Sequence, residues 1–357
     1  MGNNTFLVND LVVYEDVCNS RCTYCITSTS DLKEKHKLMV NKNTYDNESL
    51  MARLDQITEA LFNKTGARIL KVSGGEIFLV KNILKFIEKH GCSYKRIQIL
   101  TNGLLLNEEL VENLSKIQNV CVQISIDGHT MEMNRYRVEK QKLQDKILSG
   151  LRLCQVYNIP VEINCVLTDA NTDKIYTFAE YLTQYDHVIL QPFPIRGTLR
   201  DKFYPKEEQI KAIEILIENY SKYEHVLLSR VYYEKLYEFM TRGKGTERCY
   251  IPFMIYQAFD DGVLTPCPNI WFKSLGNILY NEEETLDKLN TDSFYTVLKR
   301  SKHLLLQCQN CFTPWEILNL YLHEKVTIED IRKIYLFNDP EIIKYLENMK
   351  DSIKINS

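Results

Sequence analysis

The sequence predicts an α/β fold built on a parallel sheet. Apolar, β-branched runs alternate with amphipathic stretches between Leu11 and Pro192, and this alternation implies right-handed crossovers between parallel strands. The runs are nearly all apolar, as expected for strands whose outer face is covered by helices. The expected strands are Leu11–Tyr14, Arg68–Ser73, Arg96–Thr101, Val120–Ile126, Val161–Leu167 and His187–Gln191.

The stretches between these strands have the apolar period of α-helices. In the first of them, Leu50, Leu54 and Ile57 recur at helical spacing. A sheet with such helices is either open and doubly wound or curved into part of a barrel, and the periodicity fits both. The expected helices are Asn47–Phe62, Asn82–Lys89, Glu108–Ile117, Gln141–Tyr157, Thr172–Gln184 and Lys206–Tyr220.

Length and composition limit the classes of function. The 357 residues are 45% hydrophobic, enough for a sizeable core and more than one domain. A net charge of −3 gives no electrostatic reason to expect a nucleic-acid partner, and no apolar run predicts a membrane span or a signal peptide. Eleven cysteines, seven of them in two groups, predict metal ligands and not disulfides, as in a cytoplasmic protein.

Three cysteines follow the first expected strand with the spacing CxxxCxxC: Cys18, Cys22 and Cys25. Three thiolates can hold three irons of a [4Fe–4S] cube and leave the fourth iron open to a ligand. This spacing, with Tyr24 just before the last cysteine, resembles the radical S-adenosylmethionine (SAM) superfamily. The resemblance implies a partial (β/α)6 barrel similar to a TIM barrel, SAM and a [4Fe–4S] cluster as cofactors, and a flavodoxin- or ferredoxin-type electron donor.

Polar residues and glycines follow the next three strands. The carboxyl ends of parallel strands share one rim, so these residues are expected beside the cysteine loop. The resemblance implies that they hold SAM, with Glu76 as an acceptor for its amino group and Arg137 near its carboxylate, which suits the planar guanidinium fork. Arg135 competes with Arg137 for that role. The expected cofactor-binding residues are Tyr24, Gly74, Gly75, Glu76, Asn102, Ser125 and Arg137.

Four further cysteines follow the expected barrel, and the last two form a CxxC pair. Asp261-Gly262 between apolar residues predicts a hairpin that ends near Cys267. The pattern resembles the twitch domain, a shortened SPASM extension of radical SAM enzymes, and implies a second, auxiliary [4Fe–4S] cluster. Four thiolates in two pairs also suit a structural zinc ion. The expected ligands are Cys249, Cys267, Cys308 and Cys311.

The resemblance also implies a division of the chain. Residues 1–220 are expected to form the radical SAM core barrel and residues 221–247 a connecting helix. Residues 248–315 are expected to form the twitch-type auxiliary cluster domain, and residues 316–357 the C-terminal helices.

The implied reaction is reductive cleavage of SAM followed by removal of a hydrogen atom from the substrate. Oxidative modification of a peptide or protein is the leading expectation. Oxidation of a hydroxyl on a small sugar-like or aminocyclitol molecule is the second, and a non-enzymatic iron–sulfur or zinc protein is the third. Any proton removed needs a base, and no spacing singles one out among Asp127, His129 and Glu162.

Overall fold

The computed structural model describes residues 6–13, 17–25, 47–197, 199–245, 247–271, 273–300 and 305–355. One sheet runs through the molecule in the strand order β6-β5-β4-β3-β2-β1-β7-β8-β9. The first six strands are parallel to their neighbours. They are β1 (Val8–Val13), β2 (Ile69–Gly74), β3 (Arg96–Thr101), β4 (Val120–Ser125), β5 (Val161–Leu167) and β6 (Val188–Pro194).

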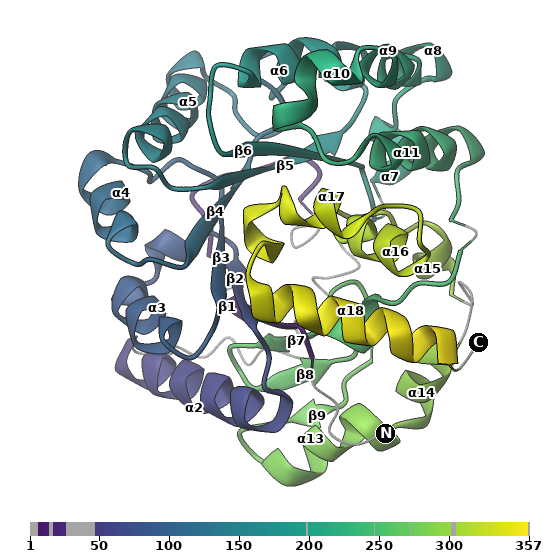
Figure 1. Cartoon of the computed structure of the whole chain (residues 1–357). Coiled ribbons are helices and arrows are strands. Elements are labelled where there is room, and N and C mark those ends of the chain that lie inside the picture. Colours follow the sequence, from purple (N-terminus) through teal and green to yellow (C-terminus); the bar gives the residue numbers. More distant parts are fainter. Residues whose placement is uncertain are drawn as a thin grey trace.

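The first six strands curve around one side of the molecule, with helices on the outside (Figure 1). The edges of the sheet are β6 and β9, so the barrel is partial, as expected. Covering helices of this region are α2 (Asn47–Thr65), α3 (Ile83–Gly91), α4 (Glu108–Ser115), α5 (Gln141–Val156), α6 (Ile175–Leu182), α7 (Arg200–Phe203), α8 (Glu207–Ile210), α9 (Ala212–Glu218), α10 (Tyr220–Tyr223) and α11 (Arg230–Arg242).

Several expected elements differ from the structure, and the first strand begins at Val8 and not at Leu11. The last strand of the barrel continues beyond Gln191 to Pro194, pairing with β5 as far as Leu167. Prolines are tolerated there because β6 is an edge strand, where a missing N–H need not break a ladder. The expected helix 206–220 is divided into α8 and α9, and a 3₁₀ turn, Thr172–Lys174, precedes α6.

The hairpin predicted around Gly262 is present and joins the same sheet. Strand β7 (Ile255–Phe259) is parallel to β1, and β8 (Val263–Thr265) returns antiparallel to β7. Gly262 has a φ of 87°, the left-handed region that glycine occupies most readily. This segment also contains α12 (Ile251–Met254), β9 (Gly276–Asn277), α13 (Glu282–Thr291), α14 (Ser293–Arg300) and α15 (Leu306–Gln309).

The C-terminal helices pack against the amino-terminal end of the barrel. Arg96, the first residue of β3, donates from Nε to the Tyr335 carbonyl at 3.1 Å and from Nη2 to Asn338 Oδ1 at 2.7 Å. The helices are α16 (Glu316–Leu322), α17 (Ile328–Arg332), a 3₁₀ turn at Tyr335–Phe337 and α18 (Pro340–Ile355). Within the described ranges, the chain has no helix with the length and apolar character of a membrane span.

Candidate active site

The cysteine loop lies on the rim formed by the carboxyl ends of the barrel strands. The Glu76 amide donates to the Val17 carbonyl at 2.9 Å, and the Thr23 amide donates to the Tyr136 carbonyl at 2.8 Å. These bonds anchor the loop to the segments that follow β2 and β4. Cys18 is exposed, and Cys22 and Cys25 are half-buried.

Hydrogen-bond donors lie beside the sulfurs of Cys18 and Cys22. Cys18 Sγ lies 3.4 Å from the Ser20 amide and 3.6 Å from Asn102 Nδ2. Cys22 Sγ lies 3.9 Å from Arg137 Nη1. Donors of this kind favour a thiolate, the form that ligates iron, although burial raises the pKa of the Cys18 thiol on balance. The chemistry of the loop therefore fits a cluster held by three thiolates.

Glu76 joins the second and third strands beneath the rim. It is 1% exposed, and its carboxylate accepts hydrogen bonds from the Thr101 hydroxyl and the Asn102 amide, each at 2.7 Å. Burial raises its pKa, although these donors oppose the shift. Gly74 is required by close packing, since a Cβ there would lie 1.8 Å from the Val13 carbonyl oxygen.

Asp127 and Arg137 form a buried ion pair directly under the cysteine loop. Arg137 Nε lies 3.0 Å from Asp127 Oδ2, and its guanidinium lies over the Tyr24 ring at 5.3 Å. Asp127 also accepts from the Tyr24 hydroxyl and from the Val166 amide. This arrangement ties the loop to β4 and β5. Ser125 is buried at the end of β4.

Three residues named from the sequence lie outside the barrel cavity or away from the cysteine loop: Arg135, a candidate for the SAM carboxylate, and Asp127 and His129, candidates for a base. Arg135 is exposed and reaches Tyr136 and Asp169, so it is Arg137 that lies beside the cysteine loop. Asp127 is held by its three partners and does not line the barrel cavity. His129 stacks on Tyr181 of α6 at 4.7 Å between ring centroids, away from the same cavity.

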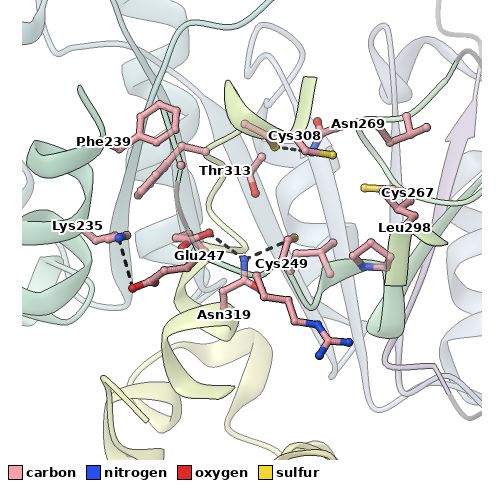
Figure 2. Close-up of a pocket in the computed structure, with 18 residues that line it drawn as sticks. Lys235, Phe239, Glu247, Cys249, Cys267, Asn269, Leu298, Cys308, Thr313 and Asn319 are labelled. Atoms are coloured by element: carbon pink, nitrogen blue, oxygen red, sulfur yellow. Dashed lines mark hydrogen bonds and ion pairs between the residues drawn. The ribbon is translucent and has the colours of Figure 1, made fainter. Parts of the chain in front are cut away.

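The second group of cysteines converges on one pocket of about 60 Å³. Figure 2 shows Cys249, Cys267 and Cys308 directed toward the same space, and Cys311 lines it as well. Burial raises the pKa of all four thiols, that of Cys308 to about 11. Each would therefore need a metal to be a thiolate near neutral pH.

Two asparagines donate to sulfurs of this pocket. Asn319 Nδ2 lies 3.6 Å from Cys249 Sγ, and Asn269 Nδ2 lies 3.3 Å from Cys311 Sγ. Such N–H···S contacts are typical of the surroundings of iron–sulfur ligands. In the part of the chain that the structure describes, no three His, Cys, Asp or Glu side chains are arranged to share a single metal ion.

A polar cavity of about 190 Å³ lies within the barrel and adjoins the four-cysteine pocket. It is lined by Ser73 and Gly74 near the rim and by Asn269 and Thr313, which also line the four-cysteine pocket. Two carboxylates lie in its wall. Asp10 is paired with Lys71 at 3.5 Å, and Glu162 accepts from Gln98 Nε2 at 2.7 Å and Gln191 Nε2 at 2.9 Å.

Most of the residues that line this cavity were not among the site residues predicted from the sequence. Asp10, Lys71, Gln98 and Gln257 lie inside largely apolar strands, and their side chains line the barrel interior. The side chains of Trp315, Leu336 and Phe337 also line the cavity. They belong to the C-terminal segment, and its apolar stripes do not indicate which surface they cover.

Comparisons with known proteins agree with this geometry. Residues 12–182 match the model of the radical SAM superfamily. The uncharacterized protein MJ0907 of Methanocaldococcus jannaschii is 26% identical over 292 residues, covering 78% of this chain and 91% of that protein. The sporulation killing factor maturation protein SkfB of Bacillus subtilis is 22% identical over 302 residues, covering 83% of this chain and 66% of SkfB.

Among solved structures, anSMEcpe with bound AdoMet and Cp18Cys peptide has a similar fold. Its TM-score is 0.57 at 18% identity, over 97% of this chain and 99% of that one. The family match begins in β1 and ends in α6, and it includes the cysteine loop and every expected SAM-binding residue. Residues 12–182 of this chain, which carry the cysteine loop, are therefore similar to the radical SAM superfamily.

Proposed function

We propose that this protein cleaves SAM reductively and oxidises a side chain of a peptide or protein. SAM and a [4Fe–4S] cluster are the cofactors of the superfamily, and Cys18, Cys22 and Cys25 would hold the cluster. With SAM bound and one electron supplied, this pair provides a deoxyadenosyl radical that removes a hydrogen atom from the substrate. A flavodoxin or ferredoxin would donate the electron.

One observation carries the assignment to oxidation. The barrel cavity reaches Gly74 beneath the rim and shares Asn269 and Thr313 with the four-cysteine pocket. A substrate in the cavity would therefore lie beside the four-cysteine pocket and below the rim that carries the cysteine loop. We infer that residues 248–315 form an auxiliary [4Fe–4S] domain, which accepts the electron left on the substrate after the hydrogen atom is removed.

A peptide substrate is favoured by the similar proteins. SkfB is a maturation protein, and anSMEcpe has been solved with a bound peptide. The polar lining of the cavity supports the second candidate, oxidation of a hydroxyl on a small sugar-like molecule. Both candidates need the same hydrogen abstraction and the same electron acceptor.

The test begins with the anaerobically reconstituted protein. We expect about eight irons per chain, as two cubes require. With dithionite and SAM the protein should release deoxyadenosine, and with its peptide substrate it should give a product that lacks two hydrogens, detected by mass spectrometry. About four irons together with zinc would instead indicate a structural second site.

Matched cysteine variants separate the two sites. Alanine at Cys18, Cys22 and Cys25 together should abolish deoxyadenosine release and leave about four irons. Alanine at Cys308 and Cys311 should retain deoxyadenosine release and lose the oxidised product. Cys92→Ala removes an exposed cysteine and should change neither readout. Deoxyadenosine release at an unchanged rate from the triple variant would rule out this function.

A further inference from the structure

Among the residues that the structure describes, four buried polar atoms of the barrel cavity lack a hydrogen-bond partner. They are the acceptor oxygens Gln98 Oε1, Glu162 Oε1 and Gln257 Oε1, together with the donor Trp271 Nε1. Gln98, Glu162 and Gln257 are at most 6% exposed, so bulk solvent does not reach their side chains. Buried polar groups in folded proteins are nearly always paired, and a group left unpaired indicates a missing partner.

The carboxylates fix the direction of the unpaired oxygens. Gln98 turns its Nε2 toward Glu162, and Gln257 turns its Nε2 toward Asp10 Oδ2 at 3.1 Å. A carboxylate accepts hydrogen bonds, so each amide must present its nitrogen to the carboxylate. The amide oxygens remain for another partner, and in this cavity that partner has to be a donor.

The charges in the cavity also favour a donor. Asp10 is balanced by Lys71 at 3.5 Å, whereas Glu162 has two neutral amides as its hydrogen-bond partners. Burial raises the pKa of Glu162 to about 7, with Lys71 opposing the shift weakly. Arg196 is the other cation that lines the cavity, and it donates to Asn269. In the described part of the chain, the Glu162 carboxyl is therefore a buried acceptor with no cation at ion-pair distance.

We propose that the cavity binds a substrate group rich in hydrogen-bond donors, a hydroxyl or an ammonium, against Glu162, Gln98 and Gln257. An apolar side chain would leave the three oxygens unpaired, and a carboxylate placed against them would meet acceptors only. This inference rests on the proposed function and specifies its substrate. The donor group can come from a peptide, as a threonine or serine side chain, or from a free aminocyclitol.

Binding of matched probes tests the inference on the reconstituted holoenzyme with SAM and without reductant, so that no turnover occurs. The probes are N-acetyl-L-threoninamide, its isostere N-acetyl-L-valinamide, and 2-deoxystreptamine, each titrated by ligand-observed NMR. We expect a donor probe to bind about tenfold more tightly than the valine probe, as expected for one good hydrogen bond. Tight binding of the threonine probe indicates a peptide source, and tight binding of 2-deoxystreptamine alone indicates a small molecule.

Glu162→Gln reverses the hydrogen-bonding character at the centre of the site. The oxygen of the new amide must still accept from Gln98 and Gln191, so its nitrogen takes the place of Glu162 Oε1. The donor probe should then bind about tenfold less tightly. Glu180→Gln, on the exposed face of α6 beside Lys222, serves as the control and should bind the probe as the unchanged protein does.

Iron content and SAM binding report whether Glu162→Gln folds. If it does not, Gln257→Met removes a second unpaired oxygen and should give the same loss of binding. Weak binding of all probes, equal binding of the threonine and valine probes, or unchanged binding in the folded variants would overturn the inference. None of these results depends on deoxyadenosine release, which tests the proposed function separately.

Discussion

Asn269 donates a hydrogen bond from Nδ2 to the sulfur of Cys311 at 3.3 Å and accepts one from Arg196. Arg196 lines the barrel cavity, whereas Cys311 lines the four-cysteine pocket. The contact therefore connects the place proposed for the substrate with a proposed ligand of the auxiliary cluster. It also gives this sulfur an external donor, which influences how readily a bound cluster accepts an electron.

Replacing Asn269 with leucine should lower the reduction potential of the auxiliary cluster. Loss of an N–H···S bond destabilises the more negative, reduced state, and we expect a shift on the order of 50 mV. A redox titration followed by electron paramagnetic resonance measures it, in a background where Cys18, Cys22 and Cys25 are alanine. Ser274→Ala, at an exposed turn of the same segment, should leave the potential unchanged; an unchanged potential in Asn269→Leu would contradict the role of this contact.

Glu162 should make stability depend on pH in a defined direction. Its pKa rises from an ordinary value of 4.5 to about 7 in the folded protein because it is buried. The folded state therefore holds more protons than the unfolded state between these values, and stability falls as pH rises through this window.

Glutamine does not titrate, so Glu162→Gln should avoid this loss. As pH rises from 5 to 8, the free energy of unfolding of the variant should increase relative to that of the unchanged protein by at most about 3 kcal/mol. The Tm of both proteins at the two pH values, measured under anaerobic conditions, checks this expectation. Glu180→Gln should show no such gain. A Tm difference that does not change with pH would mean that Glu162 titrates normally.

Replacing Arg137 with methionine should destabilise the fold much more than replacing Arg135 with methionine. Arg137→Met leaves Asp127 buried without its cation and should destabilise the fold by about 3 kcal/mol or more. Arg135 is 44% exposed at its side chain, and its loss should cost less than about 0.5 kcal/mol. Thermal unfolding and iron content measure the contrast. Equal effects would show that the Arg137–Asp127 pair does not anchor the loop.

Docking of the C-terminal segment should depend on Arg96 and not on its neighbour Lys95. Arg96 holds the Tyr335 carbonyl and Asn338 and lies over the Tyr335 ring at 4.6 Å. Lys95 makes one exposed ion pair with Glu341, a type of contact that contributes little. Arg96→Met should be cleaved after Phe337 several-fold faster in limited proteolysis, whereas Lys95→Met should be cleaved at the rate of the unchanged protein. Identical cleavage rates would contradict this assignment.

Sequence reasoning found the barrel because strong local signals agree there. The runs 96–101 and 161–167 begin and end as expected, and the glycine and polar clusters follow the strands on one rim. The hairpin at Gly262 was predicted from its turn chemistry. The pairing of β7 with β1 was not, since it joins residues more than two hundred positions apart and no local pattern encodes it.

The interior of the barrel could be predicted only in part. Glu162 was named as a base, and the structure places it in the cavity wall. Asp10, Lys71 and Gln257 were missed because a polar residue in an apolar run has no meaning until the partners across the barrel are known. Trp315 and Phe337 were missed for a related reason, since the surface covered by an apolar helix stripe is decided by tertiary packing.

The parallel pairing of β1 with β7 has a consequence for the evolution of this molecule. The strand that precedes the first three cysteines and the strand that lies between Cys249 and Cys267 share one ladder of peptide hydrogen bonds. The spacing between the two cysteine groups is thereby constrained by backbone geometry, which side-chain substitution hardly alters. Loops and surface helices can diversify toward new substrates while the two proposed cluster sites keep their separation.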